Sequence, residues 1–108
     1  MTNESFENVI LELRRGVIVL AVLSQLEQEQ YGYSLINALK AKGLDIDQGT
    51  LYPLLRRLES QGLLQSNWRV ETDRPRRYYR ISDEGTALLP RLKAEWTGIV
   101  SVMNKLLK

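Results

Sequence analysis

The sequence predicts a mainly α-helical fold that contains one small β-hairpin. Three observations support this prediction. Apolar residues recur at helical intervals in four segments, two short stretches alternate between apolar and polar residues, and a single proline-containing loop joins those two stretches. With 108 residues, 44% of them hydrophobic and 26% charged, the chain has the length and balance of one compact domain.

The first two helices are expected in the N-terminal half of the chain. Residues 9–26 are dense in apolar side chains at helical spacing, which predicts a largely buried first helix. The polar stretch EQEQYGYS ends that helix. A second, shorter helix follows, with apolar positions at Leu35, Ile36 and Leu39 and a stop signal at Gly43.

The segment GTLYPLLRRLESQGLL, residues 49–64, predicts a third helix with a proline near its start. If the cap lies between Gln48 and Thr50, Pro53 falls in or just past the first turn, where its missing N–H costs little. Gly62 ends the helix. Its apolar stripe consists of Leu51, Leu54, Leu55 and Leu58. The opposite face carries Gly49, Pro53, Arg56 and Ser60, flanked by Thr50, Tyr52 and Arg57.

Two strands are expected after this helix. The stretches LLQSNWRV and RYYRI alternate, and the loop ETDRPR joins them into a hairpin. Trp68 and Tyr79 are expected to close the sheet over the leucine core. Positive charge is concentrated here, because residues 64–80 have a net charge of +3 whereas residues 1–63 have a net charge of −2. Such a concentration favours a polyanionic partner, although a solvated basic loop is an alternative.

A final helix is expected from Ser82, a capping residue, to Leu107. Pro90 is expected to kink or interrupt it near its beginning. At 1.5 Å per residue this helix is about 39 Å long, more than the roughly 26 Å span of a 100-residue domain. A second copy of the chain is therefore expected to cover its outer turns. The predicted dimer interface, spaced alternately by three and four residues, is Leu89, Leu92, Trp96, Ile99, Met103 and Leu106.

The composition excludes several classes of function. The chain has no cysteine and no histidine, which removes disulfides, thiolate nucleophiles, imidazole bases and the common zinc sites. Asp45 and Asp47 lie in a capping loop without a nearby base, so an enzyme is not expected, nor is a metal or cofactor. The N-terminus lacks a basic leader region, and no apolar run approaches the ~20 residues of a membrane span. We expect a cytoplasmic protein without a membrane partner.

Two short helices followed by a basic hairpin form the pattern of a winged helix-turn-helix domain. In this pattern the second helix presents its N-terminal turn to the major groove of DNA, while the hairpin follows the flanking backbone. Residues 1–81 are thus expected to bind double-stranded operator DNA and residues 82–108 to form the dimerisation helix. The predicted DNA-binding residues are Gly49, Thr50, Tyr52, Pro53, Arg56, Arg57, Arg74, Arg76 and Arg77. A protein interaction module without DNA binding is the alternative, which the three hairpin arginines disfavour.

The same residues resemble the PadR family of bacterial transcriptional regulators. The resemblance is carried by YGYSLINAL (31–39), GTLYPLLRRLESQGLL (49–64), RPRRYYRIS (74–82) and Gly85. It implies a homodimer that binds operator DNA, usually as a repressor, with one long C-terminal helix packing across the dimer. Some similar proteins of this length respond to aromatic or drug-like molecules. Trp96 in the predicted seam is therefore either an anchor for dimer packing or a plate that stacks on a planar aromatic effector.

Overall fold

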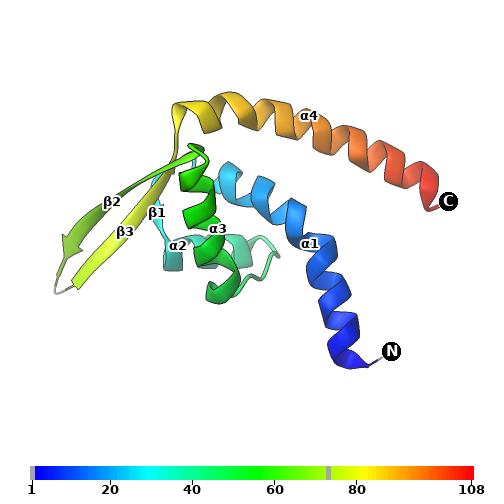
Figure 1. Ribbon diagram of the computed structural model, residues 1–108, viewed down its shortest axis with the longest axis horizontal. Helices are drawn as coiled ribbons and strands as arrows, with labels where there is room; N and C mark the ends of the chain where they lie inside the picture. Colours follow the sequence, from blue (N-terminus) through cyan, green and yellow to red (C-terminus); the bar gives the residue numbers. More distant parts are fainter. Residues whose placement is uncertain (1, 73) are drawn as a thin grey trace.

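The computed structural model describes residues 2–72 and 74–108, which form four helices and a small sheet whose hairpin projects away from the helices (Figure 1). In chain order the elements are α1 (Asn3–Gln25), β1 (Gln30–Tyr31), α2 (Gly32–Ala41), α3 (Gln48–Ser60), β2 (Leu64–Glu71), β3 (Arg74–Ile81) and α4 (Asp83–Leu106). The prediction of a mainly helical fold with a small antiparallel sheet is confirmed.

Helix α1 is longer and less buried than the sequence predicts. It begins at Asn3, where the side chain of the capping residue Thr2 accepts a hydrogen bond from the backbone N–H of Ser5. Its buried residues are Ile18, Val22 and Leu23. Leu13 is 73% exposed, because the N-terminal half of α1 extends beyond the body of the subunit (Figure 1). The expectation of a largely buried helix is therefore correct only for its C-terminal half.

The sheet contains a strand that the sequence pattern did not predict. β3 lies at its centre, and the two-residue strand β1 pairs with it antiparallel, Gln30 opposite Tyr79 and Tyr31 opposite Tyr78. β2 pairs with the other side of β3 along its whole length, which confirms the hairpin. Two residues are too few to show an alternating pattern, so β1 has no signal in the sequence.

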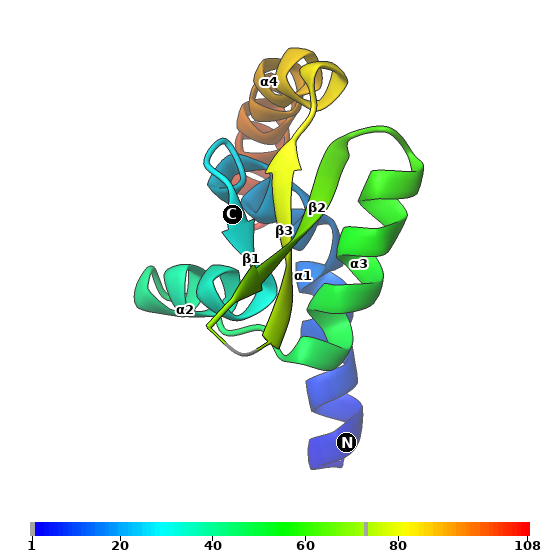
Figure 2. The same cartoon turned by 90° about the vertical axis from the view of Figure 1, so that its left-hand side faces the viewer.

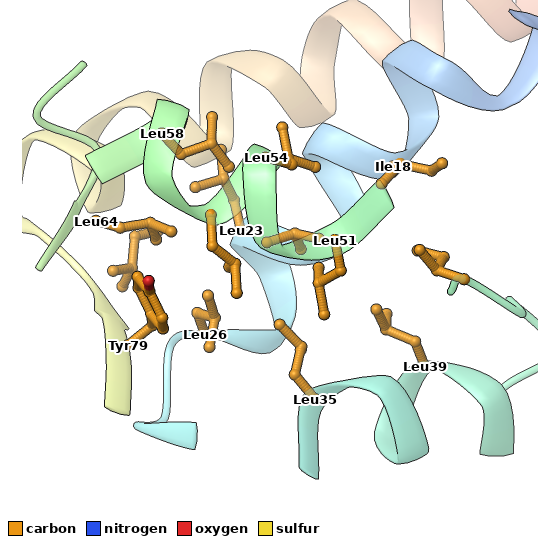
Figure 3. Close-up of a cluster of buried hydrophobic side chains, with 14 of the residues drawn as sticks. Ile18, Leu23, Leu26, Leu35, Leu39, Leu51, Leu54, Leu58, Leu64 and Tyr79 are labelled. Carbon is orange, nitrogen blue, oxygen red and sulfur yellow. The ribbon is translucent and has the colours of Figure 1, made fainter. Parts of the chain in front are cut away.

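The core lies where α1, α2 and α3 meet the base of the sheet (Figure 3). The predicted leucines of α3 are all buried: Leu51, Leu54, Leu55 and Leu58. Tyr79 is 6% exposed and closes the core as expected, but Trp68 is 64% exposed, so its predicted place in the core is wrong. The hairpin continues past the helices at this point, and strand alternation alone does not indicate where the helices end.

Pro53 and Pro90 both lie inside helices, and Pro53 lies deeper than predicted. Asp47 is the cap of α3, so Pro53 is the sixth helical residue and has no N–H to donate to the carbonyl of Gly49. Helix α4 continues through Pro90, and the predicted interruption is wrong. Pro90 and Thr86, whose carbonyl would have accepted its missing N–H, are both exposed. Water can therefore solvate that carbonyl while the helix continues.

The start of α4 is held against the turn between α3 and β2. The Ser82 hydroxyl caps α4 by accepting from the N–H of Gly85, at 3.0 Å, and donates to the carbonyl of Gly62, at 2.6 Å. The Ser82 N–H also donates to the carbonyl of Leu63. A Cβ atom at Gly85 would lie only 2.3 Å from that Leu63 oxygen, so this close approach requires glycine.

Candidate nucleic-acid interface

The first turns of α3 and the tip of the hairpin lie at the same end of the subunit (Figure 2). Between them, a cleft of about 380 Å³ is bounded by α3, the start of α2 and the hairpin. Arg56 of α3 and Arg74 and Arg77 of β3 all line this cleft. The structure thus brings together arginines from two segments that the sequence analysis assigned to one site. We call this space the hairpin cleft.

The predicted residues of α3 differ in their exposure. Those that are exposed are Gly49, Thr50, Pro53, Arg56 and Arg57. Tyr52 is half-buried, because its ring packs closely against Gly32 at the start of α2. A Cβ atom at Gly32 would lie 2.2 Å from a carbon of the Tyr52 ring. Tyr52 therefore lines the hairpin cleft and also fixes the distance between α2 and α3.

Three side chains connect α3 to the hairpin. Arg77 forms an ion pair with Glu59 at 2.7 Å, and its Nε donates a hydrogen bond to the hydroxyl of Ser66 at 3.0 Å. That hydroxyl in turn donates to the second carboxylate oxygen of Glu59 at 2.6 Å. The charge of Arg77 is thus compensated within the subunit, and the triangle fixes the hairpin relative to α3.

Arg76 also lines the hairpin cleft and is likewise paired within the subunit. It lies 3.4 Å from the carboxylate of Glu71, and its guanidinium stacks 4.6 Å from the centre of the Tyr31 ring. Such stacking and pairing stabilise a cation that is only partly exposed. Arg76 therefore holds β1 against the hairpin.

Arg69 and Tyr78 extend this stacked arrangement along the same face. The Arg69 guanidinium lies 4.4 Å from the centre of the Tyr78 ring and forms an ion pair with Glu29. The Tyr78 hydroxyl donates a hydrogen bond to Glu71, and this bond raises the pKa of the phenol. These arginines, tyrosines and carboxylates thus form a connected network along the hairpin, in which the buried Nε of Arg76 has no hydrogen-bond partner among the described residues.

The remaining cations are those with the greatest capacity to bind an external anion. In the part of the chain that the structure describes, Arg56, Arg57 and Arg74 have no carboxylate within 4.0 Å. Among the described residues, these three of the five predicted arginines therefore have no acidic partner, whereas Arg76 and Arg77 are each paired with a glutamate.

Sequence reasoning did not include two aromatic residues that line the hairpin cleft. Tyr33 and Trp68 are exposed, and both form part of its wall. Trp68 stands directly across the hairpin from Arg77. The pairing register of the hairpin places Trp68 among the cleft residues rather than in the core. The sequence alone does not give this register.

A second hollow, the interhelical groove, lies between α1 and α4 and has a volume of about 680 Å³. Its α4 wall contains four apolar residues of the outer turns: Trp96, Ile99, Val100 and Met103. Leu89, which the sequence analysis placed in a dimer interface, is only 3% exposed and belongs to the subunit core. Leu92 packs against that core. The alternating three- and four-residue spacing identifies the apolar side of α4. It does not indicate the turn beyond which α4 is no longer packed against the rest of the chain.

Other classes of site find no support among residues 2–72 and 74–108. No cluster of three or more acidic side chains could hold a metal ion there. None of the helices described is both long and apolar enough to cross a membrane.

Comparisons with known proteins agree on one family. The family described as Transcriptional regulator PadR-like matches residues 19–91. Transcriptional regulator Rv3488 of Mycobacterium tuberculosis is 40% identical over 79 residues, which cover 72% of this chain and 74% of that protein. A PadR family transcriptional regulator from Eggerthella lenta has a TM-score of 0.88 and 46% identity, covering 98% of this chain and 95% of the other. A transcriptional regulator from Clostridium thermocellum has a TM-score of 0.83 and 34% identity, covering 90% and 99%.

Proposed function

Because the chain belongs to the PadR-like family of transcriptional regulators, we propose that it binds operator DNA as a homodimer and represses transcription until a small molecule releases it. PadR-like proteins are transcriptional regulators rather than enzymes, and the chain is one of them. The division into a DNA-binding part, residues 1–81, and a dimerisation helix, residues 82–108, belongs to this proposal.

The hairpin cleft is the observation that carries the DNA-binding proposal. Arg56 and Arg74 come from different elements, line one cleft and have no carboxylate partner among the described residues. The first turn of α3 adds backbone N–H groups and the positive end of a helix dipole, both of which attract phosphate. We assign α3 to the major groove, with Arg56 reaching a base edge or a phosphate, and Arg74 to the flanking backbone.

The paired arginines have a different role in this proposal. Arg77 holds the hairpin against α3, and Arg76 holds β1 against the hairpin. Both therefore act by placing Arg74 at the correct distance from α3. Direct contact with phosphate is left to Arg56, Arg57 and Arg74.

A salt series of binding to an arbitrary duplex tests the DNA-binding proposal. Each phosphate that the protein neutralises contributes about −0.9 to the slope of log K against log salt concentration. We expect a steep slope for the wild type, and a slope shallower by about 0.9 for Arg74→Gln. Arg91→Gln, on the exposed surface of α4, is the matched control and should leave the slope unchanged. A flat response of the wild type would contradict the proposal and favour a protein interaction module.

The interhelical groove supports the homodimer. The outer turns of α4 expose large apolar side chains, with Ile99 at 51% and Leu106 at 69%. The N-terminal half of α1 is uncovered as well, including Leu13, which lines the same groove. Exposed apolar surface on two adjacent helices is typical of an interface, and a second copy can cover it symmetrically.

Trp96 is the residue through which we propose that an effector acts. It is 42% exposed on the wall of the interhelical groove, where a planar aromatic molecule between two subunits could stack on it. Binding would then shift the spacing of the two α3 helices and weaken DNA binding. We would titrate planar aromatic compounds into Trp68→Phe and Trp68→Phe/Trp96→Ala, following fluorescence in the first and operator release in both. Equal operator release in the two variants would remove Trp96 from the effector site.

A further inference from the structure

We propose that Trp68 is a further DNA-contacting residue, whose indole ring packs against the sugar–phosphate backbone of the duplex beside Arg56 and Arg74. This inference rests on the proposed function and adds to it an apolar contact. None of the charges discussed above provides such a contact.

The position of Trp68 supports this assignment. It lies on β2 opposite Arg77, on the hairpin face that turns toward α3, and it lines the hairpin cleft. The guanidinium of Arg77 lies 5.8 Å from the centre of the indole ring. Because Glu59 and Ser66 hold Arg77, the ring stands beside an already fixed group.

The exposure of Trp68 requires a reason. Two residue pairs closer to the core and on the same face, Tyr79 is buried, whereas Trp68 is exposed in the isolated subunit. Val70, further along the same strand face, is 81% exposed. A large apolar ring kept in water at the mouth of a cleft marks a binding surface, because its burial on binding contributes favourable free energy.

The chemistry of the hairpin cleft fits a nucleic-acid backbone. Its walls combine aromatic side chains, Tyr33 and Trp68 among them, with the cations Arg56 and Arg74. The backbone of DNA offers the complementary pair, an apolar face on each deoxyribose and an anionic phosphate beside it. The cleft lies between α3 and the hairpin, which are the two elements assigned to DNA.

Substitution of Trp68 gives the first test. We would measure binding of a labelled arbitrary duplex by fluorescence anisotropy over a salt series, using Trp68→Ser and Trp68→Phe. Trp68→Ser should bind about fivefold to tenfold more weakly at every salt concentration, and Trp68→Phe should stay near the wild type. The salt slope should not change in either variant, because the indole carries no charge.

The slope also detects a merely structural role. If Trp68→Ser displaced the hairpin, Arg74 would lose its phosphate contact and the slope would become shallower, as in Arg74→Gln. A shallower slope in Trp68→Ser, or an affinity equal to that of the wild type, would overturn the inference. Neither outcome for Trp68→Ser affects binding of DNA by the wild type, so neither contradicts the proposed function.

Quenching provides a second measurement. The chain has two tryptophans, so Trp96→Phe leaves Trp68 as the single reporter. Saturation with the duplex should protect Trp68 from acrylamide, while anisotropy confirms binding independently. Duplex binding without protection would overturn the inference alone, and absence of any duplex binding by the wild type would overturn the proposed function with it.

Discussion

The carboxylate of Glu59 near the end of α3 lies 2.7 Å from the guanidinium of Arg77 on β3, and this contact fixes the hairpin against the helix. Ser66 completes the connection by hydrogen bonds to both partners. Helix and hairpin therefore present their uncompensated arginines as one rigid surface.

Because the charge of Arg77 is compensated, its removal should change the salt dependence of DNA binding less than removal of Arg74. Because the Gln amide can still donate a hydrogen bond to Glu59 and hold the hairpin in place, we expect the slope of Arg77→Gln to shift by less than half of the ~0.9 expected for Arg74→Gln. Glu59→Gln releases Arg77 from its counter-charge and should steepen the slope. Salt titrations of the three variants on one duplex check this. Equal slope changes for Arg74→Gln and Arg77→Gln would show that Arg77 exchanges its partner for phosphate.

Arg56 should contribute to sequence discrimination. With an operator selected from a random pool, Arg56→Ala should weaken binding by about 1–3 kcal/mol and relax the preference at the base pair it contacts. Arg91→Ala on α4 provides the control, since it should alter neither affinity nor preference. Retention of full preference by Arg56→Ala would place another face of α3 on the DNA.

The elements that form the candidate DNA-binding site differ in how well the sequence alone predicts them. The apolar stripe of α3, the hairpin and the Ser82 cap depend on contacts within a few residues, so their patterns were informative. The ion pairs were not predictable, because Glu59 and Arg77 are 18 residues apart and Glu29 and Arg69 are 40 apart.

The sequence also did not show which turns of a helix or which residues of a strand are covered by the rest of the chain. Alternation assigned Trp68 to the correct face of the hairpin, but whether it reached the core depended on where α3 ends in space. The spacing of α4 likewise placed Leu89 on the correct side of the helix but not in the subunit core. The hydrophobic pattern thus identifies the apolar side of a helix or strand, whereas tertiary packing determines which residues on that side are buried.

A charge in the interhelical groove should dissociate the dimer. Ile99→Glu would place a carboxylate in an apolar interface, which is costly without a partner. We expect a monomer by sedimentation at concentrations where the wild type is dimeric. Ser101→Glu is the matched control, since it lies on the same helix and does not line the groove. A dimer that persists in Ile99→Glu would place the interface elsewhere.

The close approach of Gly32 to Tyr52 should appear as energetic coupling. Gly32→Ala would bring a Cβ atom 2.2 Å from the ring and should lower the free energy of unfolding by about 1–3 kcal/mol. Tyr52→Leu removes the ring edge, so the double variant should be less destabilised than the two single changes together. Urea unfolding of the four proteins measures this, and simple additivity would contradict a steric contact.

Buried tyrosine should make the fold sensitive to alkaline pH. Burial raises the pKa of Tyr79 above its usual value of 10.0. The folded chain therefore binds this proton more tightly than the unfolded chain, so the unfolding free energy falls as pH rises past the unfolded value. Tyr79→Phe should make thermal stability decline less steeply as pH rises above about 10. Identical declines in the two proteins would show that folding does not change the pKa of Tyr79.

The attachment of α4 through Ser82 and Gly85 makes this helix a lever with its pivot at the end of α3. Its 24 residues span about 36 Å, so a rotation of about 5° at the pivot moves the far end by about 3 Å. Small rearrangements where two copies meet would thus be converted into changes in the separation of their DNA-reading helices. Because the spacing of the grooves in a duplex is fixed, such a change in separation would lower the affinity for DNA.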